Sequence, residues 1–385
     1  MAPQGEGDDV RIDVDALATE LQSMMSSADS SESSHRNCIF RVPDTMLRQN
    51  PKAYTPNAFS IGPYHYDKPH LKAMQKIKLK YLRDFISRVT GSPETVLRKL
   101  STIISEERDP VFSSSSVQQL LNHDLMLLEN QIPWLVLDVL FSVINEPVPL
   151  HILVTEFFDN IFSISAGLIK RAVHRDSHEF KHILDLVRSL TVVARAEDPK
   201  KIWKWMSVWE PMPSASSLQE AGIKFKRARR ATTILDITFK NGVLEIPPLH
   251  IHERTESLFR NLICYEQCLP HCEGVITAYA ILMDNLINTA QDIELLCKSE
   301  VIDNWLDNKD AAEFFNRLYD DIGVREPYYC DLTQRVNKYC GYFWPRHRTA
   351  LVRDYFKSPW ALISVIVALI LLILAFLQTW FTITK

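Results

Sequence analysis

The segment HEFKH at residues 178–182 matches H-E-x-x-H, in which two histidines one helical turn apart bind zinc and the glutamate acts as a general base. His174 adds a third imidazole just upstream. A catalytic zinc ion also needs a third protein ligand and a water-restricted cleft. The extended form of the pattern requires Gly and His at the positions that Asp185 and Arg188 occupy. The short match alone therefore does not predict a metalloprotease.

Helical geometry also argues against a zinc site in this stretch. Successive residues of a helix turn by about 100°, so the apolar side chains from Phe180 to Leu190 would gather on one face. His178 and His182 would lie on the opposite face and are expected to point to water. We interpret the match as a chance surface pattern, and we predict no catalytic residue, no cofactor and no metal.

Three cysteines recur at every fourth position, namely Cys264, Cys268 and Cys272, with His271 beside the last of them. Zinc clusters commonly use C-x-x-C knuckles instead, and Pro270 would break a helix at this point. Free cysteine is commonly buried. With no secretory signal in the sequence, these residues are predicted to be reduced thiols of the core.

A second histidine-rich string, GPYHYDKPH, holds His65, Asp67 and His70 close together. Such a group could bind a metal ion. The Gly-Pro pair that opens the string favours a turn instead. We expect a turn, with Tyr64 and Tyr66 packed around it.

The string IKFKRARR at residues 223–230 is a candidate interaction patch. Its cations could contact nucleic acid, anionic lipid or an acidic partner. The alternative is a solvated turn, because runs of charge usually face water. The patch consists of Lys224, Lys226, Arg227, Arg229 and Arg230.

The composition is that of a globular protein of 385 residues, with 46% hydrophobic and 23% charged residues. A net charge of −4 argues against a general nucleic-acid binder. The sequence holds neither a glycine-rich phosphate loop nor a G-x-S-x-G nucleophile elbow. These features lower the expectation of an enzyme.

The strongest physical signal is the apolar run ALISVIVALILLILAFL, from Ala361 to Leu377. Extended to residues 360–381, it would reach roughly 33 Å as a helix, enough for a hydrocarbon core of about 30 Å. Trp360 and Trp380 stand at the two ends, as in an interfacial aromatic belt. This pattern predicts a C-terminal transmembrane helix that anchors the chain to the bilayer.

The flanking charges predict the orientation of this helix. Four cations between residues 346 and 357 precede it, and only Lys385 follows it. Positive residues favour the cytoplasmic side, so the preceding body is expected in the cytosol, tail-anchored to either the plasma membrane or the endoplasmic reticulum. The expected segments are a largely disordered terminus (1–36), a helical body (37–345), a basic juxtamembrane segment (346–359), the span (360–381) and a tail (382–385).

Periodicity predicts a mainly α-helical body with a small β-hairpin or antiparallel sheet. Helical patterns cover residues 68–89, 255–296, 309–322 and 331–339, and the apolar stretch 120–144 is expected to form the main core. Asn241-Gly242 separates two short strand-like runs, a strong hairpin signal. That turn would pair Phe239 with Leu244, residue 237 with residue 246, and Thr238 with Glu245.

Several strings in order make the chain resemble a plant family catalogued as domain of unknown function 247, or UPF0481-like. They include CIFRVPDTMLRQNPKAYTPNAFSIGPYHYDKPHL (38–71), DLMLLENQIPWLVLDVLF (124–141) and ILDITFKNGVLEIPPL (234–249). The family carries an apolar segment with Asp-Gly-Cys-Phe before the Leu-Glu-Asn-Gln-Ile-Pro motif, and the interval 91–122 lacks it. Either a core helix has been lost or replaced, or the gene model skips an exon.

The resemblance implies no assigned activity and no catalytic residues to carry over. Some grass members resemble self-incompatibility determinants, so recognition or signalling is the implied class of function. We expect a membrane-tethered, non-enzymatic recognition or scaffold protein whose partners are the bilayer and an unknown protein. The alternatives are a membrane-associated hydrolase or metal-dependent enzyme, and a lipid-binding module that uses residues 68–83 and 224–230.

Overall fold

The computed structural model describes residues 39–90, 111, 114–142, 147–158, 180–192, 210–229, 231, 233–269, 272–318, 328–341 and 359–383. Helices make up most of these residues, and two small sheets complete them. The predicted mainly α-helical fold with a small sheet is therefore confirmed.

The helical elements of the first half are short and are separated by turns. In chain order they are α2 (Asp44–Gln49), η2 (Pro51–Tyr54), η3 (Pro63–His65), η4 (Pro69–Leu71), α3 (Lys72–Thr90), α5 (Ser115–Leu125), η5 (Leu128–Asn130), α6 (Trp134–Ser142), α7 (Leu150–Phe157) and α9 (Ile183–Thr191).

The second half mixes strands with longer helices. Its elements are α11 (Ala215–Glu220), β1 (Lys224–Arg227), β2 (Thr238–Lys240), β3 (Val243–Ile246), β4 (Leu249–Ile251), α12 (Thr255–Cys268), α13 (Val275–Leu286), α14 (Ala290–Lys298), β5 (Ile302–Asn304), α15 (Asn308–Asn316), α16 (Cys330–Cys340) and α18 (Pro359–Ile383).

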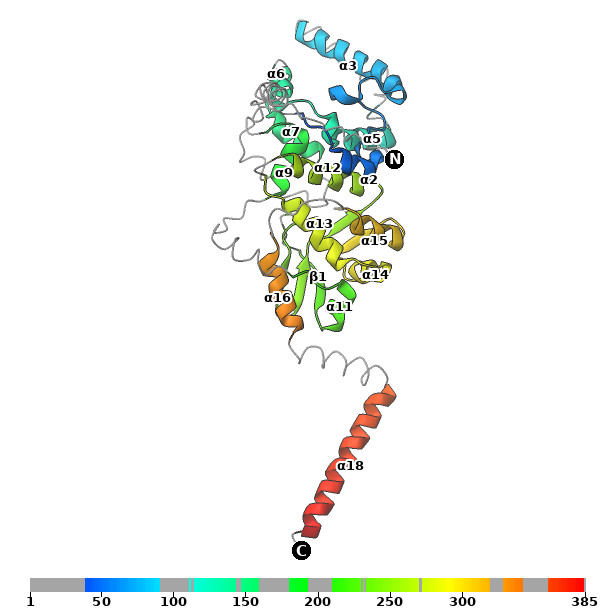
Figure 1. Ribbon diagram of the computed structural model, residues 1–385, viewed down its shortest axis with the longest axis vertical. Coiled ribbons are helices and arrows are strands. Elements are labelled where there is room, and N and C mark those ends of the chain that lie inside the picture. The colour runs from blue at the N-terminus through cyan, green and yellow to red at the C-terminus, as the bar shows by residue number, and fades with distance from the viewer. Residues whose placement is uncertain are drawn as a thin grey trace, which may run out of the picture.

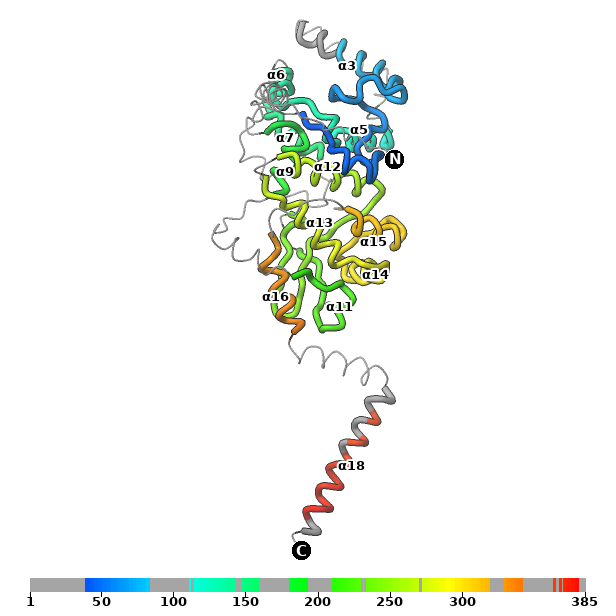
Figure 2. Tube along the Cα trace, in the orientation of Figure 1, coloured from blue at the N-terminus to red at the C-terminus, as the bar shows by residue number. Residues whose placement is uncertain are grey.

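The elements are arranged along one long axis (Figure 1). The helices α2, α3, α5, α6, α7 and α9 occupy one end of the body, and α11, α14, α15, α16 and the strands occupy the other. Helices α12 and α13 join the two halves, and α18 lies apart, beyond the end that holds α16 (Figure 2).

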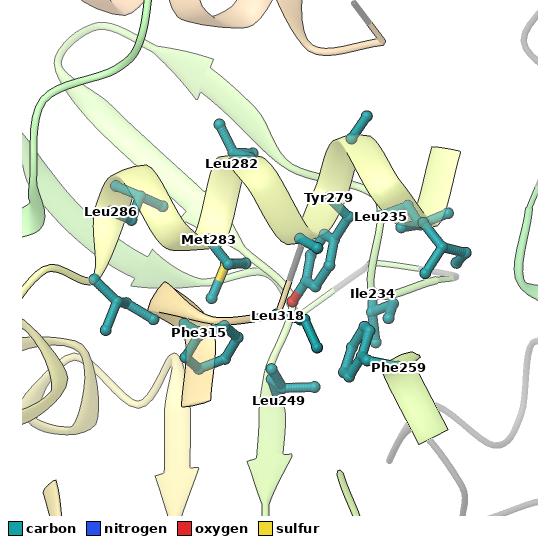
Figure 3. Close-up of a cluster of buried hydrophobic side chains, with 14 of the residues drawn as sticks. Ile234, Leu235, Leu249, Phe259, Tyr279, Leu282, Met283, Leu286, Phe315 and Leu318 are labelled. Atoms are coloured by element: carbon teal, nitrogen blue, oxygen red, sulfur yellow. The ribbon is translucent and has the colours of Figure 1, made fainter. Parts of the chain in front are cut away.

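Helices α12 and α13 form the centre of the main core (Figure 3). The rings of Phe259 and Tyr279 stack with centroids 5.8 Å apart, and both side chains are fully buried. Each such burial contributes about 1.5–3 kcal/mol. The expectation that residues 120–144 form the main core was only partly right. Met126 and Leu128 belong to that core, whereas α6 leaves Leu135 and Val139 exposed to solvent, at 70% and 58%.

The predicted hairpin is confirmed. Strands β2 and β3 pair antiparallel with Thr238 opposite Glu245 and Phe239 opposite Leu244. Asn241 and Gly242 both have positive φ, 51° and 74°, as a tight two-residue turn of this hand requires.

Strand β1 adds a parallel third strand to this hairpin, in the order β1-β3-β2. The alternative prediction of a solvated turn at residues 223–230 was therefore wrong for the first half of that segment. The reason is Phe225, which is buried in the core opposite Leu244 and holds this part of the chain extended against β3. The remaining strands, β4 and β5, form a separate two-stranded parallel sheet.

Candidate functional site

His182 occupies a different place from the one that the helical wheel predicted. Helix α9 begins only at Ile183, and His182 is its N-cap, fully buried, with Nδ1 accepting a hydrogen bond from the Asp185 amide at 3.1 Å. Its ring packs edge-on against Phe40 and Tyr265, with centroids 6.0 and 4.8 Å away. This burial lowers the pKa of His182 to about 3.

The prediction that His182 points to water was therefore wrong, because a side chain at an N-cap folds back over the first turn instead of following the wheel. His174, His178 and Glu179 lie outside the described residues. Among the residues that the structure describes, no group of three or more His, Cys, Asp or Glu side chains could hold a metal ion.

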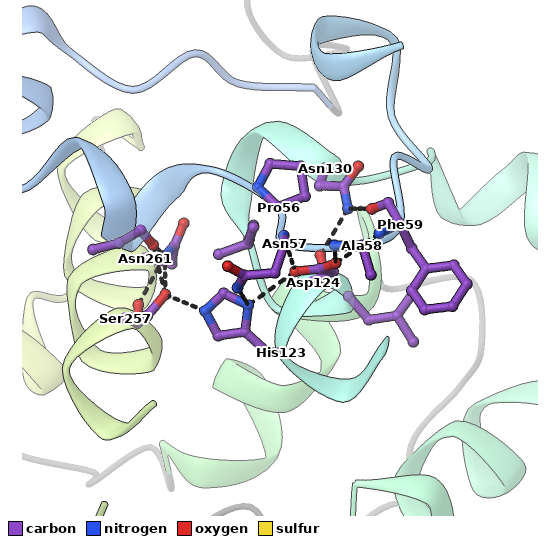
Figure 4. Close-up of polar contacts among 12 residues, drawn as sticks. Pro56, Asn57, Ala58, Phe59, His123, Asp124, Asn130, Ser257 and Asn261 are labelled. Carbon is purple, nitrogen blue, oxygen red and sulfur yellow. Dashed lines mark hydrogen bonds and ion pairs between the residues drawn. The ribbon is translucent and has the colours of Figure 1, made fainter. Parts of the chain in front are cut away.

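A Ser-His-Asp relay, which no sequence pattern indicated, lies between α5 and α12 (Figure 4). The Oγ of Ser257 is 2.9 Å from Nε2 of His123, and Nδ1 of His123 is 2.9 Å from Oδ1 of Asp124. These contacts have the connectivity of a serine nucleophile, a general base and an orienting carboxylate. The serine and the histidine are 134 residues apart, so no short motif could reveal them.

The surroundings of this relay point to a structural role. The fully buried carboxylate already accepts three backbone hydrogen bonds, of 2.7–2.8 Å, from Asn57, Ala58 and Phe59. The hydroxyl of Ser257 donates its single proton to the carbonyl oxygen of Ala53, so it accepts in its bond to His123, and the side chains of Ser257 and His123 are both buried. The hollow beside residues 131–133 and the hollow beside β1 are both lined by other residues. The relay therefore fastens the segment around residues 53–59 to α5 and α12.

Asn130 extends the same network toward the next turn. Its Oδ1 accepts from the amides of Ile61 and Gly62, at 2.6 and 3.1 Å. Its Nδ2 donates to the carbonyl oxygens of Phe59 and Asp124, at 2.7 and 2.9 Å. A Cβ on Gly62 would lie 2.8 Å from a carbonyl oxygen of η5, so glycine permits this close approach.

His65 is part of a buried pair. Its Nε2 lies 3.3 Å from Oε2 of Glu129, whose other oxygen accepts from the Val42 amide at 3.0 Å. Burial acts to raise the pKa of Glu129, but these contacts outweigh it and leave the pKa below its ordinary value. The predicted turn is confirmed as η3, whereas Tyr64 and Tyr66 are exposed and do not pack around it.

The exposed Tyr66 instead helps to line a shallow hollow of about 540 Å³ beside residues 131–133.

The three cysteines differ in burial. Cys264 is buried in α12, as predicted, whereas Cys268 and Cys272 are only partly buried, and none of them forms a disulfide. Helix α12 ends at Cys268, so Cys272 lies beyond the helix and outside its buried face.

The basic patch forms a solvent-facing edge of the three-stranded sheet. Lys224, Lys226, Arg227 and Arg229 are exposed, and Arg230 lies outside the described residues. The register places Lys226, Glu245 and Thr238 in one row on the exposed face, opposite a buried row of apolar side chains.

A hollow of about 830 Å³ lies beside this row. Its charged lining combines three cations with three carboxylates, namely Lys226, Arg227, Arg229, Asp236, Glu245 and Glu300. Glu300 has a φ of 57° and follows α14 in a left-handed C-terminal cap, which glycine favours. The site thus has mixed charge, with arginines that are exposed rather than held in the core.

The predicted membrane segment is helical. Helix α18 contains Trp360, Ala361, Leu377 and Trp380, and it has no acidic or basic residue in its end turns. The side chains of Leu377 and Trp380 are exposed. Counting only residues whose side chains the structure places, no single helix is long and apolar enough to cross a membrane, and the apolar run of α18 then extends from Ile370 to Trp380.

A family model for plant proteins of unknown function, DUF247, matches residues 39–107 and 95–374. The chain belongs to the DUF247 family. The two matches overlap at residues 95–107, inside the interval that lacks the Asp-Gly-Cys-Phe segment. Residues 91–110 themselves lie outside the described part of the structure.

Two curated relatives of this DUF247 chain come from Arabidopsis thaliana. UPF0481 protein At3g47200 is 28% identical over 408 positions, which cover 89% of this chain and 85% of the relative. A second UPF0481 protein, At3g02645, is 24% identical over 479 positions, which cover 88% and 89%. Both alignments are longer than the 385-residue chain, so each contains positions without a counterpart here. No solved structure matches the chain.

Proposed function

We propose that this DUF247 protein is a non-enzymatic interaction protein that α18 tethers to a membrane, with its body on the cytosolic side. The observation that supports the tether is α18 itself, a 25-residue helix with the sequence PWALISVIVALILLILAFLQTWFTI. At about 1.5 Å per residue its length reaches roughly 37 Å, more than a hydrocarbon core of about 30 Å. Its exposed side chains, among them Leu371, Leu372 and Leu374, have lipid as their favourable solvent.

The mixed-charge hollow beside β1 supports binding to a protein partner. Arginine is enriched at protein interfaces, where its planar group binds carboxylates with two hydrogen bonds. Arg227 and Arg229 are exposed at the rim, and Glu245 and Glu300 offer acceptors for basic groups of the same partner. A tether then raises the local concentration of this surface toward partners at the same membrane.

Flotation of the 385-residue chain with liposomes tests the tether. We expect the unmodified chain to float, and a variant with Leu371, Leu372 and Leu374 replaced by arginine to stay at the bottom of the gradient, because a charge at the bilayer centre costs about 2.5–3.5 kcal/mol on insertion scales. The matched control places arginine at three exposed leucines of the body, Leu79, Leu82 and Leu135. Flotation of the α18 variant, or failure of the unmodified chain to float, would overturn the proposal.

The second candidate function is a hydrolase, and the Ser257–His123–Asp124 relay is the observation that favours it. A fluorophosphonate probe, which labels activated serines, distinguishes the two. We expect no labelling of Ser257 in the folded chain, because its hydroxyl is buried and bonded to the Ala53 carbonyl oxygen. Labelling that disappears in Ser257→Ala would establish the enzyme instead.

A further inference from the structure

The exposed face of the three-stranded sheet differs between its two ends. At the end near the hollow, Lys226 and Thr238 flank Glu245. At the turn end, Lys224 and Lys240 flank Val243, and no carboxylate shares their row. Both lysines are exposed. The turn end of this face is therefore cationic, whereas the other end has mixed charge.

Helix α16 brings the C-terminal end of the body to this turn. The rings of Phe239 and Tyr339 lie 5.5 Å apart, and a Cβ on Gly242 would be in collision with the Tyr339 side chain. Tyr339 and Lys338 belong to the last turn of α16, and Lys338 is exposed. Among the described residues, no ion pair engages Lys338 or the two lysines of the turn row.

The chain runs from this point to α18. Residues 341–358 connect α16 to α18, and 18 extended residues reach at most about 60 Å. Their sequence carries Arg346, Arg348, Arg353 and Lys357 against one carboxylate, Asp354. The turn end of the sheet is thus at the end of the body that faces α18, and α3 lies at the opposite end (Figure 1).

We propose that the turn end of the sheet rests on anionic phospholipid headgroups of the membrane in which α18 is anchored. Lys224 and Lys240 contribute from the exposed face, and Lys338 contributes from the end of α16, which packs on the other face at Phe239. This inference rests on the proposed tether. Its chemistry is charge complementarity, since the cytoplasmic leaflet is negative and attracts lysines that lie within a Debye length of about 8 Å. The contact orients the body so that the mixed-charge hollow, farther from the turn, stays open to a protein partner.

Helix α3 is a second basic surface that could contact anionic lipid. Its exposed lysines lie at the opposite end of the body (Figure 1) and serve as the control. Lys72 and Lys76 are exposed on α3. The neighbouring Lys78 is engaged inside the body instead, because its Nζ donates to the Ser60 carbonyl oxygen at 2.6 Å and lies 6.0 Å from the centre of the Tyr66 ring.

Amine-directed labelling of the 385-residue chain in lipid nanodiscs, read by mass spectrometry, tests the inference. One disc is pure phosphatidylcholine and the other contains phosphatidylserine. We expect Lys224, Lys240 and Lys338 to react about two- to fivefold more slowly in the anionic disc and to recover in high salt. Lys72 and Lys76 should react equally in both discs.

A double variant sharpens the test. In Lys224→Glu/Lys240→Glu, the protection of Lys338 by anionic lipid should disappear, whereas Lys72→Glu/Lys76→Glu should keep it. Equal reaction of the turn-end lysines in both discs would overturn the inference, as would protection of Lys72 and Lys76 in their place. Co-elution of the chain with the discs is measured on the same samples, so a failure of the tether is distinguished from a failure of the lipid contact.

Discussion

The joint between α5 and α12 and the exposed face of the β1-β3-β2 sheet are both rich in polar and charged residues, but they differ in how those residues are paired. In the joint, Asp124, Ser257 and the side chain of His123 are buried, and their described side-chain hydrogen bonds run to one another and to groups of the segment around residues 53–59 and of α12. On the sheet face, Lys224 and Arg229 are exposed. The difference teaches that residues of catalytic type can also serve as buried connections between elements of the fold. The groups left facing solvent are the ones available to a partner.

The largest expected effect is a loss of folding stability when a side chain of the joint is removed. Asp124→Ala should destabilise the chain by at least about 3 kcal/mol, because it leaves three backbone amides without an acceptor in a buried site. Urea unfolding in mild detergent measures this change. The same substitution at Asp307, an exposed N-cap of α15, should cost only about 1 kcal/mol. Equal losses at the two positions would contradict the assigned role of the joint.

The second effect is a pH dependence that His182 creates. Its folded pKa is about 3 against 6.5 when unfolded, so in that window only the unfolded chain binds the proton. The contribution of His182 to the free energy of unfolding is therefore fully present above pH 6.5. It falls with decreasing pH by about 1.4 kcal/mol per unit, or about 2 kcal/mol by about pH 5.

Substitution of this histidine isolates its contribution. His182→Asn keeps a good N-cap without a titrating ring, so most of the slope between pH 6.5 and 5 should vanish from urea unfolding curves. The control His70→Asn changes an exposed histidine and should retain the slope. An unchanged slope in His182→Asn would show that this ring is not buried in the neutral form.

A smaller effect is expected at the rim of the mixed-charge hollow. Glu300→Gly should stabilise the chain by about 1 kcal/mol, because Glu300 holds a positive φ that favours glycine. A shift in the urea midpoint measures this gain. Glu245→Gly on the neighbouring strand should be destabilising instead, since it places glycine inside a strand. A loss of stability in Glu300→Gly would mean that the glutamate makes a contact worth more than its backbone strain.

The smallest effect is expected for the exposed cations themselves. Lys226→Ala and Arg229→Ala should change the free energy of unfolding by less than about 0.5 kcal/mol, because both side chains are exposed. Thermal unfolding followed by circular dichroism measures this. A loss as large as that of Asp124→Ala would assign the sheet face to the core and remove its availability to a partner.

Local features of the fold could be predicted from the sequence, and distant pairings could not. The Asn241-Gly242 turn specifies a hairpin and its register within a few residues, so Phe239 opposite Leu244 was correctly predicted. Strand β1 pairs with β3 across about 20 residues of intervening chain. Nothing within the string IKFKRARR indicates that partner, so the sequence alone does not predict a strand there.

The site residues show the same limit. His182 was placed on the wrong face because its position depends on where α9 begins, and one residue separates a cap from a helical position. The relay joins Ser257 to His123 over a sequence separation of 134 residues, and only the folded chain brings them together. The exposure of Lys224, Lys226 and Arg227 is what their charge predicts, and partner binding by this patch stays a prediction.

The central claim is that lipid solvates α18 and holds the body at a membrane. Alkaline carbonate extraction of microsomes from cells that express the 385-residue chain tests it most directly, because carbonate releases peripheral proteins and leaves spanning ones in the bilayer. The account predicts that the chain sediments with the membranes. Recovery of the chain in the carbonate supernatant would contradict it.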